Sequence, residues 1–469
     1  MFRKTKIVCT LGPAVDSEER LRALIDAGMN VARINCSHAE PEMRRRWVDW
    51  VRKIANEKGV FVAILFDLQG PKFRLSEIVG EAMEVEPGTA IQVGMLPGQL
   101  PIDVPEILGA LAPGRKLLIG DGDVTFRVAS TDGGITLVCL TGGEIRSRQG
   151  VTVAGVAFDS PPLLPKDIED MQSAADMNVD YVAISYVRRA SDVVEAVKRA
   201  RALDKHLKVI AKIEMREAVM DIDDIVAASD GVMVARGDMG LQMAIEDVPL
   251  VQKRIITLCR GAGKPVITAT QMMESMVVNP RPTRAEATDI ANAIFDGTDA
   301  IMLSGETAYG KHPILAVEYM DRIARKTERS GAYLRSIVEP RGDRISQATE
   351  AVARSAVDIA SNIKVRAIVC FSSSGFTARM IAKYRPKTRI LCATPVLQTA
   401  RQAALFWGVK PVLTPPFGAT EEMIEGGFAA AIEKGEIKPG DMVVVTAGLP
   451  VGKPGTTNFV TLLKVDGDG

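Results

Sequence analysis

The sequence is poor in the residues that build zinc sites and disulfide frameworks. Its 469 residues include only three histidines and six cysteines, and no two cysteines form a CxxC pair. Histidines and cysteines scattered in this way lack the spacing of zinc ligands. Most of the cysteines lie in apolar, strand-like stretches, as reduced core thiols do. We therefore expect a cytoplasmic protein without a zinc site.

An excess of charge and long hydrophobic runs are also missing. Basic and acidic residues each number 58, so the formal net charge is zero, and nothing favours nucleic acid or an anionic membrane as a partner. No run of about 18 apolar residues is present to span a membrane. The opening stretch MFRKTKIVCTLGP has too short an apolar run for a signal peptide.

Short apolar runs with strand character alternate with amphipathic, helix-like segments. The runs are residues 5–12, 31–35, 61–68, 181–185, 208–214, 231–238, 265–271 and 300–308. Parallel strands that are buried on both faces have this pattern, and eight strand–helix units predict an α/β fold, the TIM (β/α)8 barrel. A doubly wound open sheet is the alternative. Polar residues at nearly every strand's carboxyl end favour the barrel, because barrel active sites lie there.

Two segments depart from this alternation. Residues 71–154 contain short alternating stretches broken by DGD, TDGG and Pro-Gly pairs, which predicts a small inserted β-barrel domain that could act as a lid. Residues 345–469 restart the strand–helix alternation and predict a C-terminal α/β domain. The catalytic barrel then comprises residues 1–70 and 155–335, and Arg341, Gly342 and Asp343 mark a linker.

The most informative residues lie where two of the predicted barrel strands end. Lys212 and Glu214 alternate along one strand and so share a face, and Asp238 ends the next strand. Two carboxylates from neighbouring strands suit Mg²⁺, and a lysine beside them suits phosphate or enolate charge. The alternative is a surface ion pair where strands meet loops.

Other strand ends also carry polar groups. Arg33, Asn35 and Ser37 alternate on one face. The arginine could hold phosphate, and the neutral oxygens suit a monovalent cation or a nucleotide, with ordinary strand-end hydrogen bonding as the alternative. Asp67 ends the third strand, just before the turn into the inserted domain.

Groups suited to a substrate carboxylate follow the later strands. Gly237 and Asp238 precede a helical turn whose amides could bind an anion. Thr270 ends the seventh strand, where its hydroxyl could bind a carboxylate or donate a proton, and Ser304 ends the eighth.

In the C-terminal domain, the stretch CFSSSGFTAR lies where a strand turns into a helix. Its hydroxyls and amides form a candidate phosphate cradle made by Ser372, Ser373, Ser374, Gly375 and Thr377. The stretch lacks the ending of a Walker loop, and plain N-capping is the alternative.

Taken together, these segments resemble the pyruvate kinase family, in particular its bacterial, K⁺-independent members. The matching stretches include TKIVCTLGPA, AGMNVARINCSH, FDLQGPKFR, MVARGDMG and the run from residue 270 to 308. The resemblance implies transfer of the phosphoryl group of phosphoenolpyruvate to ADP, giving pyruvate and ATP in the last step of glycolysis. It also implies Mg²⁺ or Mn²⁺ as cofactor, a homotetramer and allosteric regulation.

The resemblance assigns roles around the predicted metal. Glu214 and Asp238 would bind the divalent cation, Lys212 would stabilise the phosphoryl group in flight, and Arg33 would hold it. The amides of Gly237 and Asp238 would hold the substrate carboxylate. The same resemblance gives the Thr270 hydroxyl to that carboxylate, and it leaves Thr270, Ser304 and water as candidates to protonate the enolate.

The resemblance also assigns nucleotide and effector contacts. Asn35, His38 and Arg74 would contact the nucleotide, and Asp121 resembles a lid residue that closes onto the metal. Residues 372–377 resemble the family's effector loop, with a sugar phosphate or AMP as the phosphorylated effector.

Two departures from the family pattern bear on function. Gln149 stands where a lysine commonly precedes a lid glycine, which puts nucleotide contacts from the lid in question. Lys72 and Leu68 stand where K⁺-dependent members carry glutamate and threonine, so the resemblance implies that K⁺ is not required. A vestigial cation site would then comprise Asn35, Ser37, Asp67 and Leu68, with its charge supplied by Lys72.

Two other functions remain open at this point. One is a metal-dependent barrel lyase acting on a pyruvate enolate, against which the lid and the pair of Arg33 and Lys212 argue. The other is a catalytically inactive metabolite-binding paralogue, against which the intact set of polar strand-end residues argues.

Overall fold

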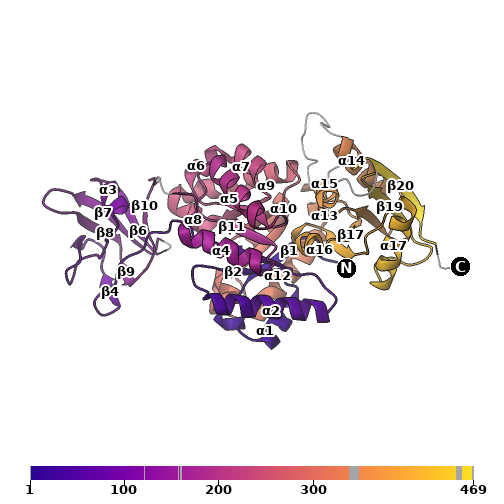
Figure 1. Cartoon of the computed structure of the whole chain (residues 1–469). Helices are drawn as coiled ribbons and strands as arrows, with labels where there is room; N and C mark the ends of the chain where they lie inside the picture. Colours follow the sequence, from indigo (N-terminus) through magenta and orange to yellow (C-terminus); the bar gives the residue numbers. More distant parts are fainter. Residues whose placement is uncertain are drawn as a thin grey trace.

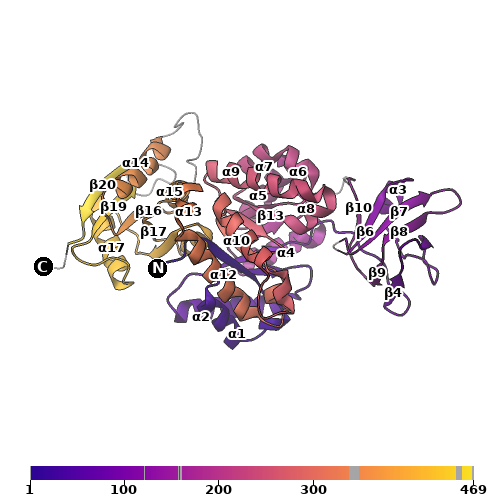
Figure 2. The same cartoon turned by 180° about the vertical axis from the view of Figure 1, so that it is seen from behind.

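The computed structural model describes residues 2–120, 122–156, 158, 161–336, 348–449 and 457–466. The predicted linker residues Arg341, Gly342 and Asp343, and the lid residue Asp121, lie outside these ranges. The inserted domain lies at one end of the molecule, the barrel in the middle and the C-terminal domain at the other end (Figures 1 and 2). In the described part of the chain, no helix is long and apolar enough to cross a membrane.

The central unit is a closed barrel of eight parallel strands in the order β1-β15-β14-β13-β12-β11-β3-β2. The strands are β1 (Lys6–Thr10), β2 (Val31–Asn35), β3 (Ala63–Asp67), β11 (Tyr181–Ile184), β12 (Lys208–Ile213), β13 (Gly231–Ala235), β14 (Val266–Ala269) and β15 (Ala300–Leu303). All eight coincide with the apolar runs. The barrel prediction is therefore confirmed, and the open-sheet alternative is excluded.

Helices between the strands form the outer layer of the barrel. They are α1 (Glu18–Ala27), α2 (Pro41–Glu57), α4 (Pro165–Asp176), α5 (Ala190–Leu203), α6 (Arg216–Met220), α7 (Ile222–Ala228), α8 (Arg236–Gln242), α9 (Val248–Gly261), α10 (Arg284–Asp296), α11 (Gly305–Ala308), α12 (Pro313–Glu328) and α13 (Gly331–Ser336). Side chains alternate along each strand: Ile7 and Cys9 pack in one buried cluster with the helices, and Val8 packs in another with neighbouring strands. The strands are thus buried on both faces.

The inserted domain is built from strands, as predicted, but they hydrogen-bond as two sheets. A five-stranded sheet has the order β10-β6-β7-β8-β5, and β4 pairs with β9. The elements are β4 (Ala82–Val85), β5 (Ala90–Gln92), α3 (Pro105–Ala110), β6 (Lys116–Ile119), β7 (Val124–Ser130), β8 (Thr136–Thr141), β9 (Gly143–Arg146) and β10 (Val151–Val153). A single closed barrel needs every edge strand paired on both sides, and the described β5 and β10 each pair with one strand.

The C-terminal domain is a five-stranded sheet in the order β18-β17-β16-β19-β20, with helices packed on it. Its elements are α14 (Ala348–Asn362), β16 (Ala367–Phe371), α15 (Phe376–Ala382), β17 (Arg389–Thr394), α16 (Leu397–Gln402), β18 (Val409–Leu413), α17 (Thr420–Glu433), β19 (Met442–Ala447) and β20 (Phe459–Lys464). The predicted α/β domain is confirmed. The antiparallel edge strand β20 was not part of the prediction.

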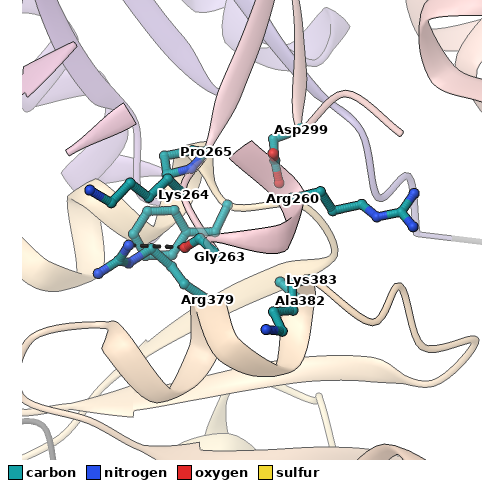
Figure 3. A pocket seen from close by; sticks show the side chains of 9 residues that line it. Arg260, Gly263, Lys264, Pro265, Asp299, Arg379, Ala382 and Lys383 are labelled. Atoms are coloured by element: carbon teal, nitrogen blue, oxygen red, sulfur yellow. Dashed lines mark hydrogen bonds between the residues drawn. The ribbon is translucent and has the colours of Figure 1, made fainter. Parts of the chain in front are cut away.

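Cations of α15 and of the turn after it attach this domain to the ends of two barrel helices. Arg379 donates to the Gly263 carbonyl at 3.0 Å (Figure 3), and Lys383 donates to the Gly261 carbonyl at 3.2 Å. Arg385 donates to the Gly297 carbonyl, just after α10, at 2.6 Å. Carbonyls at helix carboxyl termini attract cations in this way. The C-terminal domain is therefore held at the amino-terminal side of the barrel, away from the strands' carboxyl ends.

Lys6, at the start of β1, is a buried lysine at the same junction. Its side chain is 3% exposed, and its ammonium donates to the Val409 carbonyl of β18 at 2.7 Å. Among the described residues, no carboxylate lies within ion-pair distance of it. Burial, reinforced by the nearby Arg3 cation, lowers the pKa of Lys6 to about 7.

We predict that Lys6→Met stabilises the protein at pH 7. The native pKa lies near 7 and that of an unfolded lysine near about 10.4, so the unfolded chain binds more protons between these values. Stability contributed by this group therefore rises with pH across that window. The melting temperature of Lys6→Met, followed by circular dichroism, should exceed that of the wild type at pH 7, and the difference should shrink towards pH 10.

Lys205→Met, at an exposed position of the barrel, is the matched control and should leave the pH dependence unchanged. A lower melting temperature of Lys6→Met at pH 7 would mean that the bond to Val409 outweighs the cost of burying the charge.

Candidate active site

Lys212 is the centre of a polar cluster at the carboxyl ends of the barrel strands. Its ammonium lies 3.1 Å from Asp67 Oδ1 and 2.9 Å from Glu214 Oε1. It also donates to the Ser185 hydroxyl at 2.8 Å. These groups end β3, β12 and β11, which are neighbours in the barrel. Lys212 and Glu214 therefore lie side by side, as their alternation predicted.

The carboxylates determine the charge state of this cluster. Burial disfavours the Lys212 ammonium, but Asp67, Glu214 and Asp238 outweigh burial and raise the pKa of Lys212 above its ordinary value. For Asp67, burial is outweighed by Lys212 and Arg33, so its pKa is lowered. For Glu214, burial and the neighbouring Asp238 outweigh Lys212 and raise the pKa. A divalent cation would relieve the repulsion between these two carboxylates.

Arg33 is held rigidly beside this cluster. Its Nε and Nη2 atoms donate to Asp67 Oδ2 at 2.8 and 2.6 Å, and its Nη1 atom donates to the Thr10 hydroxyl at 2.9 Å. Asp67 thus pairs with both Arg33 and Lys212. Sequence reasoning missed Thr10 and Ser185. Both stand at strand ends, where the alternation that singled out Lys212 could have found them.

The residues present fit a divalent cation that takes few protein ligands. Glu214 Oε2 accepts from the Tyr186 amide at 2.6 Å, which fixes its orientation. Asp238 lies in the first turn of α8, because β13 already ends at Ala235; its predicted place at a strand end is corrected accordingly. In the described part of the chain, no group of three acidic, cysteine or histidine side chains could hold a metal. Two carboxylates suit Mg²⁺, which completes its shell with water and substrate oxygens.

Thr270 and Gly237 are in direct contact. The Gly237 amide donates to the Thr270 hydroxyl at 2.8 Å, and that hydroxyl donates to the Ala269 carbonyl at 2.7 Å. Thr270 has φ 63°, a costly conformation for a β-branched residue. Tyr186 and Gln271 also have positive φ, at 56° and 53°. Strained backbone is therefore concentrated at this end of the barrel, where sequence reasoning had no signal for it.

Ser304 caps α11 at the end of the eighth strand. Its Oγ is buried and makes no hydrogen bond within the described residues, while its amide donates to Glu306 Oε2 at 2.7 Å. A buried hydroxyl is normally hydrogen-bonded. Ser304 is therefore the side chain here with an unused donor for a ligand or water.

The predicted nucleotide residues lie at the hinge of the inserted domain. Burial and the cations Arg74, Lys72 and Arg33 lower the pKa of His38. Arg74 donates to the Arg148 carbonyl at 3.0 Å. The Lys72 ammonium lies 3.9 Å from Asp238 Oδ1, so the hinge reaches the predicted metal ligand.

Other predicted residues near the hinge serve local contacts. Asn35 Oδ1 accepts from the Ser37 amide at 3.0 Å. Leu68 is buried, and its carbonyl accepts from the Ser185 hydroxyl at 2.7 Å. Gln149 Oε1 accepts from the Arg146 amide at 2.9 Å. Gln149 is thus engaged by the backbone of its own domain.

The candidate phosphate cradle lies in the other domain, at the turn from β16 to α15. Ser373 and Ser374 are exposed, whereas Ser372 is half-buried. Gly375 adopts φ 74°. The Thr377 hydroxyl is buried and bonded to the Thr457 hydroxyl at 2.7 Å. The serines therefore face solvent, and Thr377 is used inside the domain.

A closed parallel barrel with polar side chains gathered at the carboxyl ends of its strands is typical of a TIM-barrel enzyme. Residues 2–317 match the family model of the pyruvate kinase barrel domain, and residues 350–463 match that of the pyruvate kinase alpha/beta domain. The chain belongs to the pyruvate kinase family, whose members are phosphotransferases.

Curated relatives cover almost the whole chain. The pyruvate kinases of Geobacillus stearothermophilus and Sporosarcina psychrophila are each 43% identical to it, over 98% of this chain and 80% of the relative. The pyruvate kinase of Staphylococcus aureus strain MRSA252 is 41% identical over the same shares. The family resemblance seen in the sequence is thereby confirmed.

Proposed function

We propose that this protein transfers the phosphoryl group of phosphoenolpyruvate to ADP, with Lys212 as its central catalytic group. The observation that carries the proposal is the buried Lys212 ammonium, held between Asp67 and Glu214 and beside Arg33 at the carboxyl end of the barrel. A fixed positive charge at the position where negative charge is transferred stabilises the transition state without reorganisation.

The neighbouring side chains supply the other interactions that the reaction needs. Arg33, fixed by Asp67 and Thr10, binds phosphoryl oxygens through its remaining donor capacity. Glu214 and Asp238 hold Mg²⁺ or Mn²⁺, which when bound supplies Lewis-acid charge to the substrate oxygens.

The substrate carboxylate takes the place of the bond between Gly237 and Thr270, with the Asp238 amide beside it. The Gly237 amide then donates to the carboxylate, and the Thr270 hydroxyl does so by turning its proton from the Ala269 carbonyl to the carboxylate. Thr270, Ser304 and water are the proton sources for the enolate, and the unpartnered Ser304 hydroxyl supports its candidacy. His38, Arg74 and Asn35 contact the nucleotide.

The alternatives make different demands on the site. A lyase acting on a pyruvate enolate needs neither the cations at the hinge nor a second domain over the barrel mouth. A catalytically inactive paralogue needs no charged Lys212. The proposal also includes a homotetramer, which rests on the family resemblance, and a cytoplasmic location, which rests on the reduced core thiols.

Replacing Lys212 should remove transition-state stabilisation. We expect Lys212→Met to lower kcat by about 10²-fold or more with little change in KM for phosphoenolpyruvate, measured as pyruvate formation with ADP and Mg²⁺. Lys208→Met is the matched control, because Lys208 begins the same strand and faces Asp230 instead; its kcat should be unchanged. Near-normal kcat in Lys212→Met would reject the assignment, and no activity in the wild type would reject the proposed function.

The chain's own cations are proposed to replace K⁺. Asp67, a member of the vestigial cation site, already pairs with Arg33 and Lys212, and Lys72 brings a further ammonium to within 3.9 Å of Asp238. A tethered ammonium offsets substrate charge without uptake of an ion.

We therefore expect equal activity in KCl and in tetramethylammonium chloride at fixed ionic strength. Lys72→Glu should weaken activity and create a K⁺ response, whereas Lys116→Glu, the same charge change at an exposed position of the inserted domain, should not. Strong activation of the wild type by K⁺ alone would contradict this prediction.

The exposed serines of the β16–α15 turn are proposed to bind a phosphorylated effector. Ser373→Ala combined with Ser374→Ala should abolish activation by sugar phosphates or AMP and preserve basal activity. Ser361→Ala, whose hydroxyl bonds within α14, is the control and should be activated normally. Unchanged activation of the double variant, measured at subsaturating phosphoenolpyruvate, would exclude these serines.

A further inference from the structure

A cleft of about 630 Å³ separates the start of the chain from the amino-terminal edge of the C-terminal sheet. Its walls come from the segment before β1 and from the segments that lead into β16, β17 and β19. The charged residues lining it are five cations and one carboxylate: Lys4, Lys364, Arg366, Lys387, Arg389 and Asp441. Its volume is typical of small-molecule sites.

Charge and size together distinguish this cleft from three other hollows in the described part of the chain. The hollow beside α8 contains Arg236 and Lys253 with Asp289 and Asp296, so its charges balance. Arginine and acidic side chains also balance in the hollow along α2. The cavity beneath α15 is cationic but holds only about 10 Å³, the room of a single water.

Two of the lining lysines are available to a ligand. Lys364 and Lys387 are exposed, and neither forms an ion pair or side-chain hydrogen bond among the described residues. Lys4 donates to the Pro386 and Lys387 carbonyls, both at 2.8 Å, and its ammonium lies 5.0 Å from the centre of the Trp407 ring. The Lys4 ammonium is thereby held at one wall of the cleft.

The two arginines are oriented by Glu436. Arg389 Nη1 donates to Glu436 Oε2 at 2.8 Å, and Arg366 Nε donates to the Glu436 carbonyl at 3.2 Å and lies 3.8 Å from Asp441 Oδ2. Glu436 also pairs with Lys410. The charges of Glu436 and Lys410 cancel, so the cleft keeps its excess of positive charge. The arginines therefore keep a fixed position while some of their donors remain for a ligand.

We propose that this cleft binds the phosphate dianion of a small phosphorylated metabolite. Arginine forks and lysine ammonium groups are the donors that phosphate prefers, and a concave, cationic wall concentrates anions. The site is distinct from the effector serines, because β16 runs from the cleft at Ala367 to the serine turn after Phe371. A ligand here contacts both the segment before β1 and the C-terminal domain, and so holds the two together.

The test is calorimetric titration with inorganic phosphate at low ionic strength. The background is Ser373→Ala with Ser374→Ala, which removes the other proposed phosphate site of this domain. Adding Lys364→Gln and Lys387→Gln should abolish one phosphate site per chain or weaken it at least about tenfold. It should also reduce the rise in melting temperature that phosphate produces. Lys198→Gln with Lys205→Gln, the same charge change on exposed barrel residues, should leave binding unchanged.

A second variant guards against a folding artefact. Thr388→Glu places a carboxylate in the cleft and should cause the same loss while kcat for pyruvate formation is preserved. Unchanged phosphate binding in both cleft variants would overturn the proposal. Binding of a single-stranded oligonucleotide but not of phosphate would also overturn it. Because the readout is binding, the proposal can fail while the kinase activity stands.

Discussion

The requirement to pair buried charge governs the barrel's carboxyl end. Lys212, Asp67 and Glu214 are all buried, and each ion leaves water at a cost of several kcal/mol that only close partners can offset. Those partners stand on different strands, so the cluster exists only when β3, β11 and β12 are in their native register. Assembly of the site therefore depends on the register of three neighbouring strands.

At the opposite end of the barrel, buried cations are also paired, there with helix-end carbonyls as well as carboxylates. Lys383 binds the carbonyl of the last residue of α9, Arg379 binds a carbonyl just after α9, and Arg385 binds one just after α10. Helix carboxyl termini carry partial negative charge, and Lys383 and Arg385 also pair with the carboxylates of Glu350 and Asp299. Within the described residues, the Lys6 ammonium has only a backbone carbonyl as its hydrogen-bond partner. That carbonyl does not offset the cost of burying the ammonium, so the pKa of Lys6 is lowered to about 7. Both barrel ends thus hold charge in ion pairs, and the amino-terminal end adds the partial charges of helix-end carbonyls.

Much of this structure could be predicted from the sequence. Two simple patterns determine it: the spacing of apolar runs along the chain and the alternation of side chains along each strand. Apolar runs located all eight barrel strands, and alternation placed Lys212 beside Glu214. The pairing of Arg33 with Asp67 was not accessible, because it joins different strands and depends on register. The two-sheet form of the inserted domain and the edge strand β20 were missed for a related reason. Hydrogen bonding between strands distant in sequence leaves little local signal.

The positive φ of Thr270 was the least accessible feature, and its neighbours explain how it persists. Arg236 donates to the Thr270 carbonyl at 2.6 Å and to the Ala269 carbonyl at 3.2 Å. It is itself fixed by Asp289 at 2.7 Å. A strained residue persists when several contacts fix its conformation. The Arg236 guanidinium binds the carbonyls on both sides of the strained φ torsion of Thr270. The Thr270 hydroxyl and Gly237 amide are consequently held in place before any ligand arrives. A carboxylate that binds there replaces the existing acceptors of these two donors and needs no refolding of the loop, which is the condition for tight, preorganised recognition.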